Sequence, residues 1–339
     1  MELDQFTDIL RARDKIMEAR RKMGGEEVIY AGKSRKIIGL SCGRKNGNSE
    51  ILLKEAAIGA EEFGIETEII RAMELRVKPC NGCDACLAAL SNGKIASCSV
   101  RDDDVEWILQ KTVVEDCGLI VSFPVYYSRP NGYLISINER MHAAMYKYLE
   151  VLDKKNRVGG IISVGGSGPA RTPLSLILAN MWVQHHHTVV DQFQVYFAGQ
   201  SGAVLENKDT MARARELGRN VARAMIMPWE EVKFVGEETP MSCPVCHCNI
   251  LQVPDDSTTV VCPSCWVHGK VVIENGKMRV KWDDWEATHS QWSLYGLYHH
   301  MNDLCQRRKA PSRAEENELK KLKKQYSAYG RIIRPDSRE

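Results

Sequence analysis

Eight of the twelve cysteines fall into two groups whose spacing is typical of metal or redox chemistry. The second group consists of two Cys-x-x-Cys pairs with fifteen residues between them. Four thiolates at this spacing predict a tetrahedral zinc site, which is structural because it leaves no coordination position open. A rubredoxin-like iron is the alternative, since the same thiolates would accept it. The predicted ligands are Cys243, Cys246, Cys262 and Cys265.

The first cysteine group has the spacing Cys-x-x-Cys-x-x-Cys, with a fourth cysteine after eleven further residues. Three thiolates so spaced can bind one cubane, and the fourth could complete the ligands of a [4Fe-4S] cluster. The alternative is that all four are buried or redox-inert thiols without a cluster. These residues are Cys80, Cys83, Cys86 and Cys98.

A polar, glycine-containing segment at residues 41–49 lies between an apolar run and a stretch of helix-forming composition. Free backbone N–H groups and the helix dipole favour a phosphate at such a junction. Arg44 and Lys45 add positive charge to it. The alternative interpretation is a plain strand-to-helix turn. The side-chain hydrogen-bond donors of the segment are Ser41, Asn46, Asn48 and Ser49.

The elements that must position these residues alternate regularly along most of the chain. Strands are predicted at residues 35–40, 66–71, 118–123, 158–164 and 188–195. Helices are predicted at residues 50–63, 103–114 and 135–153, from residue 172, and at 209–225. Five strands separated by helices predict a doubly wound α/β fold with a parallel sheet. In such a sheet the carboxyl ends of the strands form a crevice for a ligand.

Changes in composition divide the chain into five parts. We predict an N-terminal helical extension (1–33), the α/β domain (34–227), a linker (228–240), a zinc ribbon (241–281) and a helical basic tail (282–339). Residues 306–339 hold eleven Lys or Arg against five Asp or Glu. With Trp282, Trp285 and Trp292 nearby, this region could bind nucleic acid. Packing of the tryptophans and a solvated Lys-rich helix is the interpretation that we favour.

Further motifs follow along the chain in the same order as in a known protein family. They are the first cysteine group, three aspartates at 102–104, Pro124-Val125-Tyr126-Tyr127 at a strand end, and the loop 165–168 after the next strand. Together with the loop 41–49, this set resembles the NADPH-dependent FMN reductase and iron–sulfur flavoprotein family over residues 35–226. Cys42 and Gly43 depart from the Ser and Pro common in that family, and the spacing to Cys98 is longer than in its compact cluster motif.

The resemblance implies a flavodoxin-like fold and an FMN site at the strand ends. The loop 124–131 would lie along the isoalloxazine ring, and the loop 165–168 would contact its pyrimidine side. No catalytic acid or base is predicted, because the flavin carries the hydride and electron chemistry. For the two tyrosines, a core or interface position is the alternative. The predicted FMN-binding residues are Ser41, Arg44, Asn46, Asn48, Ser49, Pro124, Val125, Tyr126, Tyr127, Asn131, Gly165 and Gly166.

We therefore expect an FMN-dependent oxidoreductase of the iron–sulfur flavoprotein type, similar to flavin reductases. It would pass electrons between NAD(P)H, as co-substrate, or a small electron carrier and an unidentified small-molecule or protein acceptor. The alternative is a redox-sensing or scaffold flavoprotein that binds a protein or nucleic-acid partner through the ribbon and tail. The resemblance also implies a homodimer or higher oligomer.

Charge and hydropathy disfavour some classes of partner. The formal net charge of +2 gives no global field that would attract nucleic acid or an anionic membrane. The amino-terminal residues contain no continuous apolar run, which predicts neither a signal peptide nor a membrane anchor and hence a cytoplasmic protein.

Two local clusters resemble metal sites, but we predict simpler roles for them. Asp102, Asp103 and Asp104 should cap the following helix and charge its first turn. Consecutive histidines at 185–187 cannot all face one point, which predicts a surface or dimer-contact position.

Overall fold

The computed structural model describes residues 34–91, 98–143, 157–254, 258–293, 295–297, 299–300, 303, 313–327 and 329–330. The predicted N-terminal helix lies outside these residues, as does the second half of the helix predicted at 135–153. No helix among the described residues is long and apolar enough to cross a membrane.

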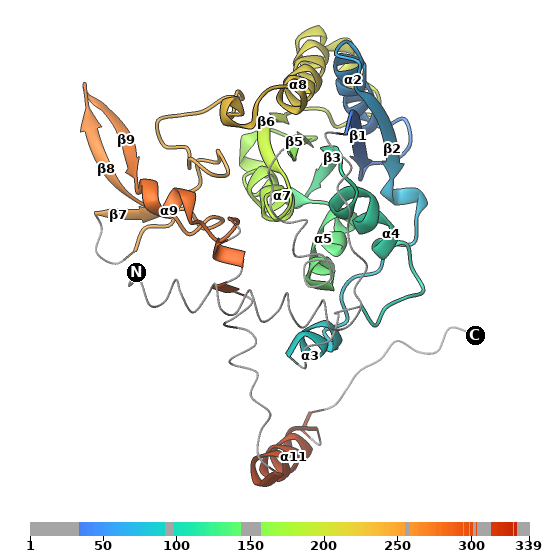
Figure 1. The fold of residues 1–339 in the computed structure, drawn as a ribbon, viewed down its shortest axis with the longest axis vertical. Helices are drawn as coiled ribbons and strands as arrows, with labels where there is room; N and C mark the ends of the chain where they lie inside the picture. The colour runs from blue at the N-terminus through green and yellow to red at the C-terminus, as the bar shows by residue number, and fades with distance from the viewer. Residues whose placement is uncertain are drawn as a thin grey trace.

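A parallel sheet forms the centre of the larger part of the molecule (Figure 1), in the order β2-β1-β3-β5-β6. A two-residue strand, β4 (Arg129–Pro130), pairs antiparallel with the end of β3. The predicted flavodoxin-like, doubly wound α/β fold is therefore confirmed. The five long strands are β1 (Lys36–Ser41), β2 (Glu66–Arg71), β3 (Gly118–Tyr126), β5 (Val158–Val164) and β6 (Thr188–Val195).

Helices cover both faces of the sheet because its strands are apolar on both sides. On one face, α2 (Asn48–Glu61) and α8 (Lys208–Ile226) pack on Ile37 and Ile120. The opposite face packs against three shorter helices through side chains such as Ile38. These helices are α4 (Val105–Leu109), α5 (Gly132–Glu139) and α7 (Ser175–Val183).

Two glycines bring α2 and α8 into close contact. A Cβ at Gly218 would lie 1.8 Å from the carbonyl oxygen of Ala56, and one at Gly59 would lie 2.1 Å from that of Arg215. Any side chain at either position would push the helices apart. This contact fixes α2, whose amino terminus faces the strand ends.

Short helical turns complete the α/β part. The helix predicted at 103–114 is divided, because α4 continues as the π-helical turn η2 (Gln110–Val114). The remaining elements are η1 (Ala72–Glu74), α3 (Ala85–Ser91), η4 (Pro169–Arg171), η5 (Ala203–Glu206) and η6 (Trp229–Glu231).

A second, antiparallel sheet follows the linker, with strands β7 (Thr259–Val261), β8 (His268–Glu274) and β9 (Lys277–Trp282). Asn275 and Gly276, both with positive φ, form the tight turn between β8 and β9. After it come α9 (Asp284–Thr288) and α11 (Arg313–Ser327), and no residue of α11 is buried.

The histidine cluster shows that one prediction was wrong. His186 and His187 are fully buried rather than on the surface. Their Nδ1 atoms lie 2.6 Å apart, and Nε2 of His187 donates to the carbonyl oxygen of Cys117 at 2.9 Å. Consecutive side chains diverge on a regular helix or strand, but residues 184–187 form a turn after α7 that buries both rings. His186 packs edge-on against Trp182 there.

Candidate flavin site and metal centre

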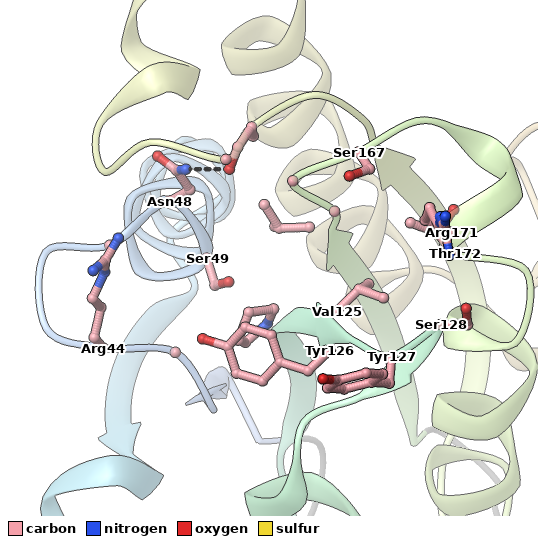
Figure 2. Close-up of a pocket in the computed structure, with 18 residues that line it drawn as sticks. Arg44, Asn48, Ser49, Val125, Tyr126, Tyr127, Ser128, Ser167, Arg171 and Thr172 are labelled. Atoms are coloured by element: carbon pink, nitrogen blue, oxygen red, sulfur yellow. Dashed lines mark hydrogen bonds between the residues drawn. The ribbon is translucent and has the colours of Figure 1, made fainter.

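A cavity of about 490 Å³ opens where the carboxyl ends of β1, β3, β5 and β6 meet. This volume lies in the usual range for small-molecule sites. Figure 2 shows Asn48 and Ser49 on one side, Tyr126 and Tyr127 on another, and Ser167, Arg171 and Thr172 opposite Arg44. The lining residues are Gly43, Arg44, Gly47, Asn48, Ser49, Pro124, Val125, Tyr126, Tyr127, Ser128, Val164, Gly165, Gly166, Ser167, Arg171, Thr172, Ala198 and Gly199.

The loop before α2 forms the polar side of the cavity. Asn48 and Ser49, the first residues of α2, place the free N–H groups of the helix amino terminus there. The amide Nδ2 of Asn48 donates to the carbonyl oxygens of Ala198 at 2.9 Å and Gln200 at 2.7 Å. Its Oδ1 is buried and has no hydrogen-bond partner among the described residues, which leaves an acceptor for a bound ligand.

A buried carboxylate supports this loop from beneath. Oε2 of Glu50 accepts the backbone N–H of Asn46 at 3.3 Å, and Arg71 donates to both carboxylate oxygens at 3.0 Å. Burial opposes ionisation, but the hydrogen bonds and charges of Arg71 and Lys54 prevail and lower the pKa of Glu50 to about 2. The ionised Glu50 carboxylate therefore holds the loop, and the positive charges of Arg71 and Lys54 balance its charge.

The aromatic side of the cavity is a strained turn after β3. Tyr127 and Ser128 both have positive φ, 50° and 67°, which is uncommon for residues other than glycine. The short strand β4 holds this turn by pairing with Val125 and Tyr126. Tyr127 is 98% exposed and Tyr126 58% exposed, so their rings are free to contact a ligand or a second subunit.

Two backbone loops close the third side. The N–H of Gly165 donates to Val195 at 2.8 Å, and the N–H of Ala198 donates back to Gly165 at 3.0 Å. A Cβ at Gly165 would lie 2.5 Å from Thr172 Cγ2, and one at Gly166 would lie 3.2 Å from Gly199 Cα. The two loops can approach this closely because glycines, which have no side chain, stand at the points of contact. The loops therefore present backbone groups to the cavity.

The predicted residues divide into two sets. Ser41, Asn46 and Asn131 do not line the cavity; Asn131 instead donates from Nδ2 to the carbonyl oxygen of Cys42 at 2.6 Å. Outside the predicted loops, the cavity is also lined by Val164, Arg171, Thr172, Ala198 and Gly199. Ala198 and Gly199 follow the fifth strand at the edge where the other loops meet. The predicted residues that line the cavity are Arg44, Asn48, Ser49, Pro124, Val125, Tyr126, Tyr127, Gly165 and Gly166.

The second cysteine group forms a compact cluster beside the small sheet. Its four sulfurs lie within 4.8 Å of one another, and all four residues are buried. Each pair sits on a turn: the N–H of His247 donates to Cys243 and that of Trp266 to Cys262, both at 2.9 Å. Hydrogen bonds from the other three cysteines hold the pKa of Cys262 well below its usual range. This arrangement fits one tetrahedral metal ion.

Comparison with known proteins decides the family. Residues 35–201 match the model described as NADPH-dependent FMN reductase. The chain is 32% identical over 200 residues to an iron–sulfur flavoprotein of Methanocaldococcus jannaschii, covering 56% of this chain and 97% of that protein. The chain belongs to the iron–sulfur flavoprotein family. It is an oxidoreductase, and FMN is the cofactor of this family.

Other relatives extend beyond the FMN reductase region. A flavone synthase of Aspergillus candidus is 25% identical over 331 residues, covering 89% of this chain and 99% of that protein. A solved structure described as a flavone reductase has the same fold, with a TM-score of 0.62 and 22% identity over 89% of this chain and all of that one.

The first cysteine group is more open than the second. Cys80 and Cys83 are exposed, whereas Cys86 and Cys98 are half-buried. Burial, with smaller effects from Cys98 and Cys80, raises the pKa of Cys86. Among the described residues, however, only the second group gathers its sulfurs within 4.8 Å.

A buried arginine holds the segments that carry the first cysteine group. Arg140 forms an ion pair with Asp103 at 2.7 Å, and both side chains are 1% exposed. Its guanidinium also donates to the carbonyl oxygens of Lys78 at 3.2 Å and Val100 at 2.8 Å, and it lies against Cys98. Arg140 thus connects the segments before Cys80 and after Cys98 to the end of α5.

Each of the three aspartates of this region has a partner other than a metal ligand among the described residues. Lys78 pairs with Asp102, Arg140 pairs with Asp103, and Asp104 accepts the backbone N–H of Arg76 at 2.7 Å. Asp104 occupies the N-cap position of α4, but its side chain makes no capping hydrogen bond. The prediction that the aspartates precede α4 at its N-cap was therefore right. The prediction that their side chains cap the helix was wrong.

Proposed function

We propose that this FMN-dependent oxidoreductase takes electrons from NAD(P)H or a small electron carrier and passes them to a small-molecule or protein acceptor. The observation that carries the proposal is the cavity at the strand ends, which has a helix amino terminus on one side and exposed aromatic rings on another. The first side suits a phosphate, and the second suits a planar ring.

Each side of the cavity would have its own task. The α2 amino terminus and Arg44 would bind the phosphate, and the orphaned Oδ1 of Asn48 would accept a hydrogen bond from the ribityl chain. Backbone groups of the loops at Val125 and Gly165 would orient the ring. FMN, when bound, supplies the hydride and electron chemistry, so the protein needs to bind, orient and exclude water.

We propose that the acceptor is a planar aromatic compound. The flavone synthase and flavone reductase relatives, which match almost the whole chain, support this class. Near the mouth of the cavity, Tyr127 and the 75% exposed Phe197 offer aromatic faces. Phe197 lies against the 165–168 loop, because a Cβ at Gly168 would be 2.9 Å from its ring.

The two cysteine groups would bind different metals. We propose zinc for the buried second group, where it would stabilise the ribbon without taking part in the reaction. For the first group we propose a [4Fe-4S] cluster that relays single electrons to or from the flavin. A cubane holds its cysteine ligands farther apart than a single ion does, which agrees with the wider spacing of this group.

Turnover tests the proposal against the sensor or scaffold alternative. FMN-loaded protein should oxidise NADPH, or a reduced carrier, when given a flavone or a quinone. A Gly165→Val variant, whose side chain would meet Thr172, is the matched control and should lose FMN and turnover together. An FMN-loaded protein that turns over neither donor with any acceptor, but binds a partner in a redox-dependent way, would support the alternative instead.

A further inference from the structure

A second cavity, of about 890 Å³, runs along the outer edge of the sheet. Five consecutive residues of the β6 segment, 192–196, line it. Successive residues of a strand point to opposite faces, so a cavity lined by five in a row lies beside the strand rather than over one face. The amino-terminal ends of α7 and α8 form two more walls, and residues 237–239, 242 and 247–250 close the far side. We call this cavity the edge groove.

The backbone of β6 faces the edge groove. β6 is the last strand in the sheet order, so no further strand pairs with it among the residues that the structure describes. Its outer edge is covered at two carbonyl oxygens, where Val235 donates to Val190 at 2.8 Å and Arg213 donates to Gln192 at 3.3 Å. The carbonyl of Val195 points inward to Gly165, so the alternate residues Gln194 and Tyr196 present their backbone groups to the groove. An open strand edge is a template for an added strand.

The edge groove is acidic. Asp209 and Glu237 are exposed on its walls, and neither has an ion-pair partner within the described part of the chain. Its one arginine, Arg213, is already paired with the buried carboxylate of Asp191, to which Nη1 donates at 2.8 Å. A strand that enters this groove should therefore carry positive charge.

The chain itself contains a segment of this kind. Residues 331–334 read Arg-Ile-Ile-Arg, in which two β-branched residues that favour strands lie between two cations. Pro335 follows, and proline is tolerated at the end of an edge strand. The segment belongs to the basic region 306–339, which opposes the charge of the groove.

A neighbouring molecule is the better source of this segment. α11 precedes it and has no buried residue; Leu319, Leu322 and the 78% exposed Tyr326 follow one another at helical spacing. In Figure 1, α11 stands apart from both sheets. An apolar stripe that packs on no described part of its own chain is suited to contact a second copy.

We propose that the edge groove receives residues 331–334 of a second copy of this chain as a strand bonded to the outer edge of β6. Backbone hydrogen bonds from Gln194 and Tyr196 would hold the strand, and Asp209 and Glu237 would select its arginines. The groove shares Thr172 with the flavin cavity, so the exchange would place the second copy next to that cavity.

Amide hydrogen exchange of the full-length protein tests this proposal, measured on the β6 peptide at high and low protein concentration. Exchange of Gln194 and Tyr196 should be about tenfold slower at high concentration. Because successive residues face opposite sides, one of the variants Ile332→Pro and Ile333→Pro must remove a donor that faces β6. That variant should abolish the protection, whereas Ile333→Val, which keeps the strand preference, should retain it.

Two results would overturn the proposal. Equal β6 exchange in the wild type and both proline variants would show that the segment does not bind there. Protection that persists on a monomer at every concentration, checked by sedimentation, would show that the segment binds its own chain and that the second copy is the wrong source.

Discussion

The two cysteine groups have similar spacing in the sequence and different surroundings in the structure. In the second group, two tight turns bring four buried sulfurs within 4.8 Å, and Ile177 of α7 packs against them. In the first group, two exposed and two half-buried cysteines lie on segments that Arg140 holds together. Spacing thus identifies candidate ligands, whereas the supporting backbone decides how closely they gather.

Loss of the second group should have the largest effect on stability. Cys246→Ser should lose zinc and unfold the ribbon, because structural zinc contributes on the order of 10 kcal/mol in zinc-finger peptides. FMN should stay bound, since no ribbon residue lines its cavity. Zinc analysis and thermal unfolding check this prediction.

Cys248→Ser provides the matched control for that variant. Cys248 is buried close to the cluster but is not one of its four residues. Zinc should therefore remain bound after its replacement. Loss of FMN in Cys246→Ser would contradict the independence of the two sites.

Replacement of Arg140 should have the next largest effect. Arg140→Met leaves the buried Asp103 carboxylate without its partner, which typically costs about 3–5 kcal/mol. The cysteine segments should separate, so any iron bound there should be lost while zinc stays. Denaturant unfolding and metal analysis measure both effects. Arg219→Met, at an exposed ion pair with Glu62, is the control and should change neither metal content nor stability noticeably.

A smaller effect concerns the flavin cavity, which neither cysteine group lines. The folded-state pKa of Glu50 is about 2, below its value in the unfolded chain. Its stabilisation should therefore be full above about pH 4.5 and disappear as the pH falls toward 2, a contribution of roughly 1–3 kcal/mol. Unfolding of wild type and Glu50→Gln across this range should converge at low pH. A constant difference between them would show that the Glu50 charge is not responsible.

The smallest effect on stability should come from the exposed first group. Cys83→Ser should leave zinc, FMN and the thermal unfolding temperature unchanged, because this side chain is exposed. Its contact of 2.8 Å with the hydroxyl of Ser99 is exposed as well, and a serine hydroxyl can replace it. Only iron should be lost. Unchanged iron content after this substitution would exclude Cys83 as a cluster ligand.

Much of the fold could be predicted from the sequence because its signals are local. The strands 66–71, 158–164 and 188–195 occur at the residues predicted for them. The flavin loops could be located because parallel strands bring their carboxyl ends together. The same rule would have found Ala198 and Gly199 had it been applied to the fifth strand.

The contacts that the sequence did not reveal join residues far apart in the chain. Asp103 looked like a helix cap, but it pairs with Arg140, 37 residues away. Asn131, a predicted flavin-binding residue, does not line the cavity and donates to the carbonyl oxygen of Cys42, 89 residues away. Side-chain burial at His186 likewise depends on how α7 meets the sheet. No local pattern carries this information.

The most direct test is the ultraviolet–visible spectrum of protein purified without oxygen, with iron and zinc analysis, before and after NADPH is added. Flavin bands, about one zinc and about four irons per chain, and bleaching by NADPH are the predicted result. Flavin and zinc without iron would reduce the first cysteine group to structural thiols. Protein that binds no FMN, even when it is supplied, would contradict the central claim that the cavity at the strand ends is a flavin site.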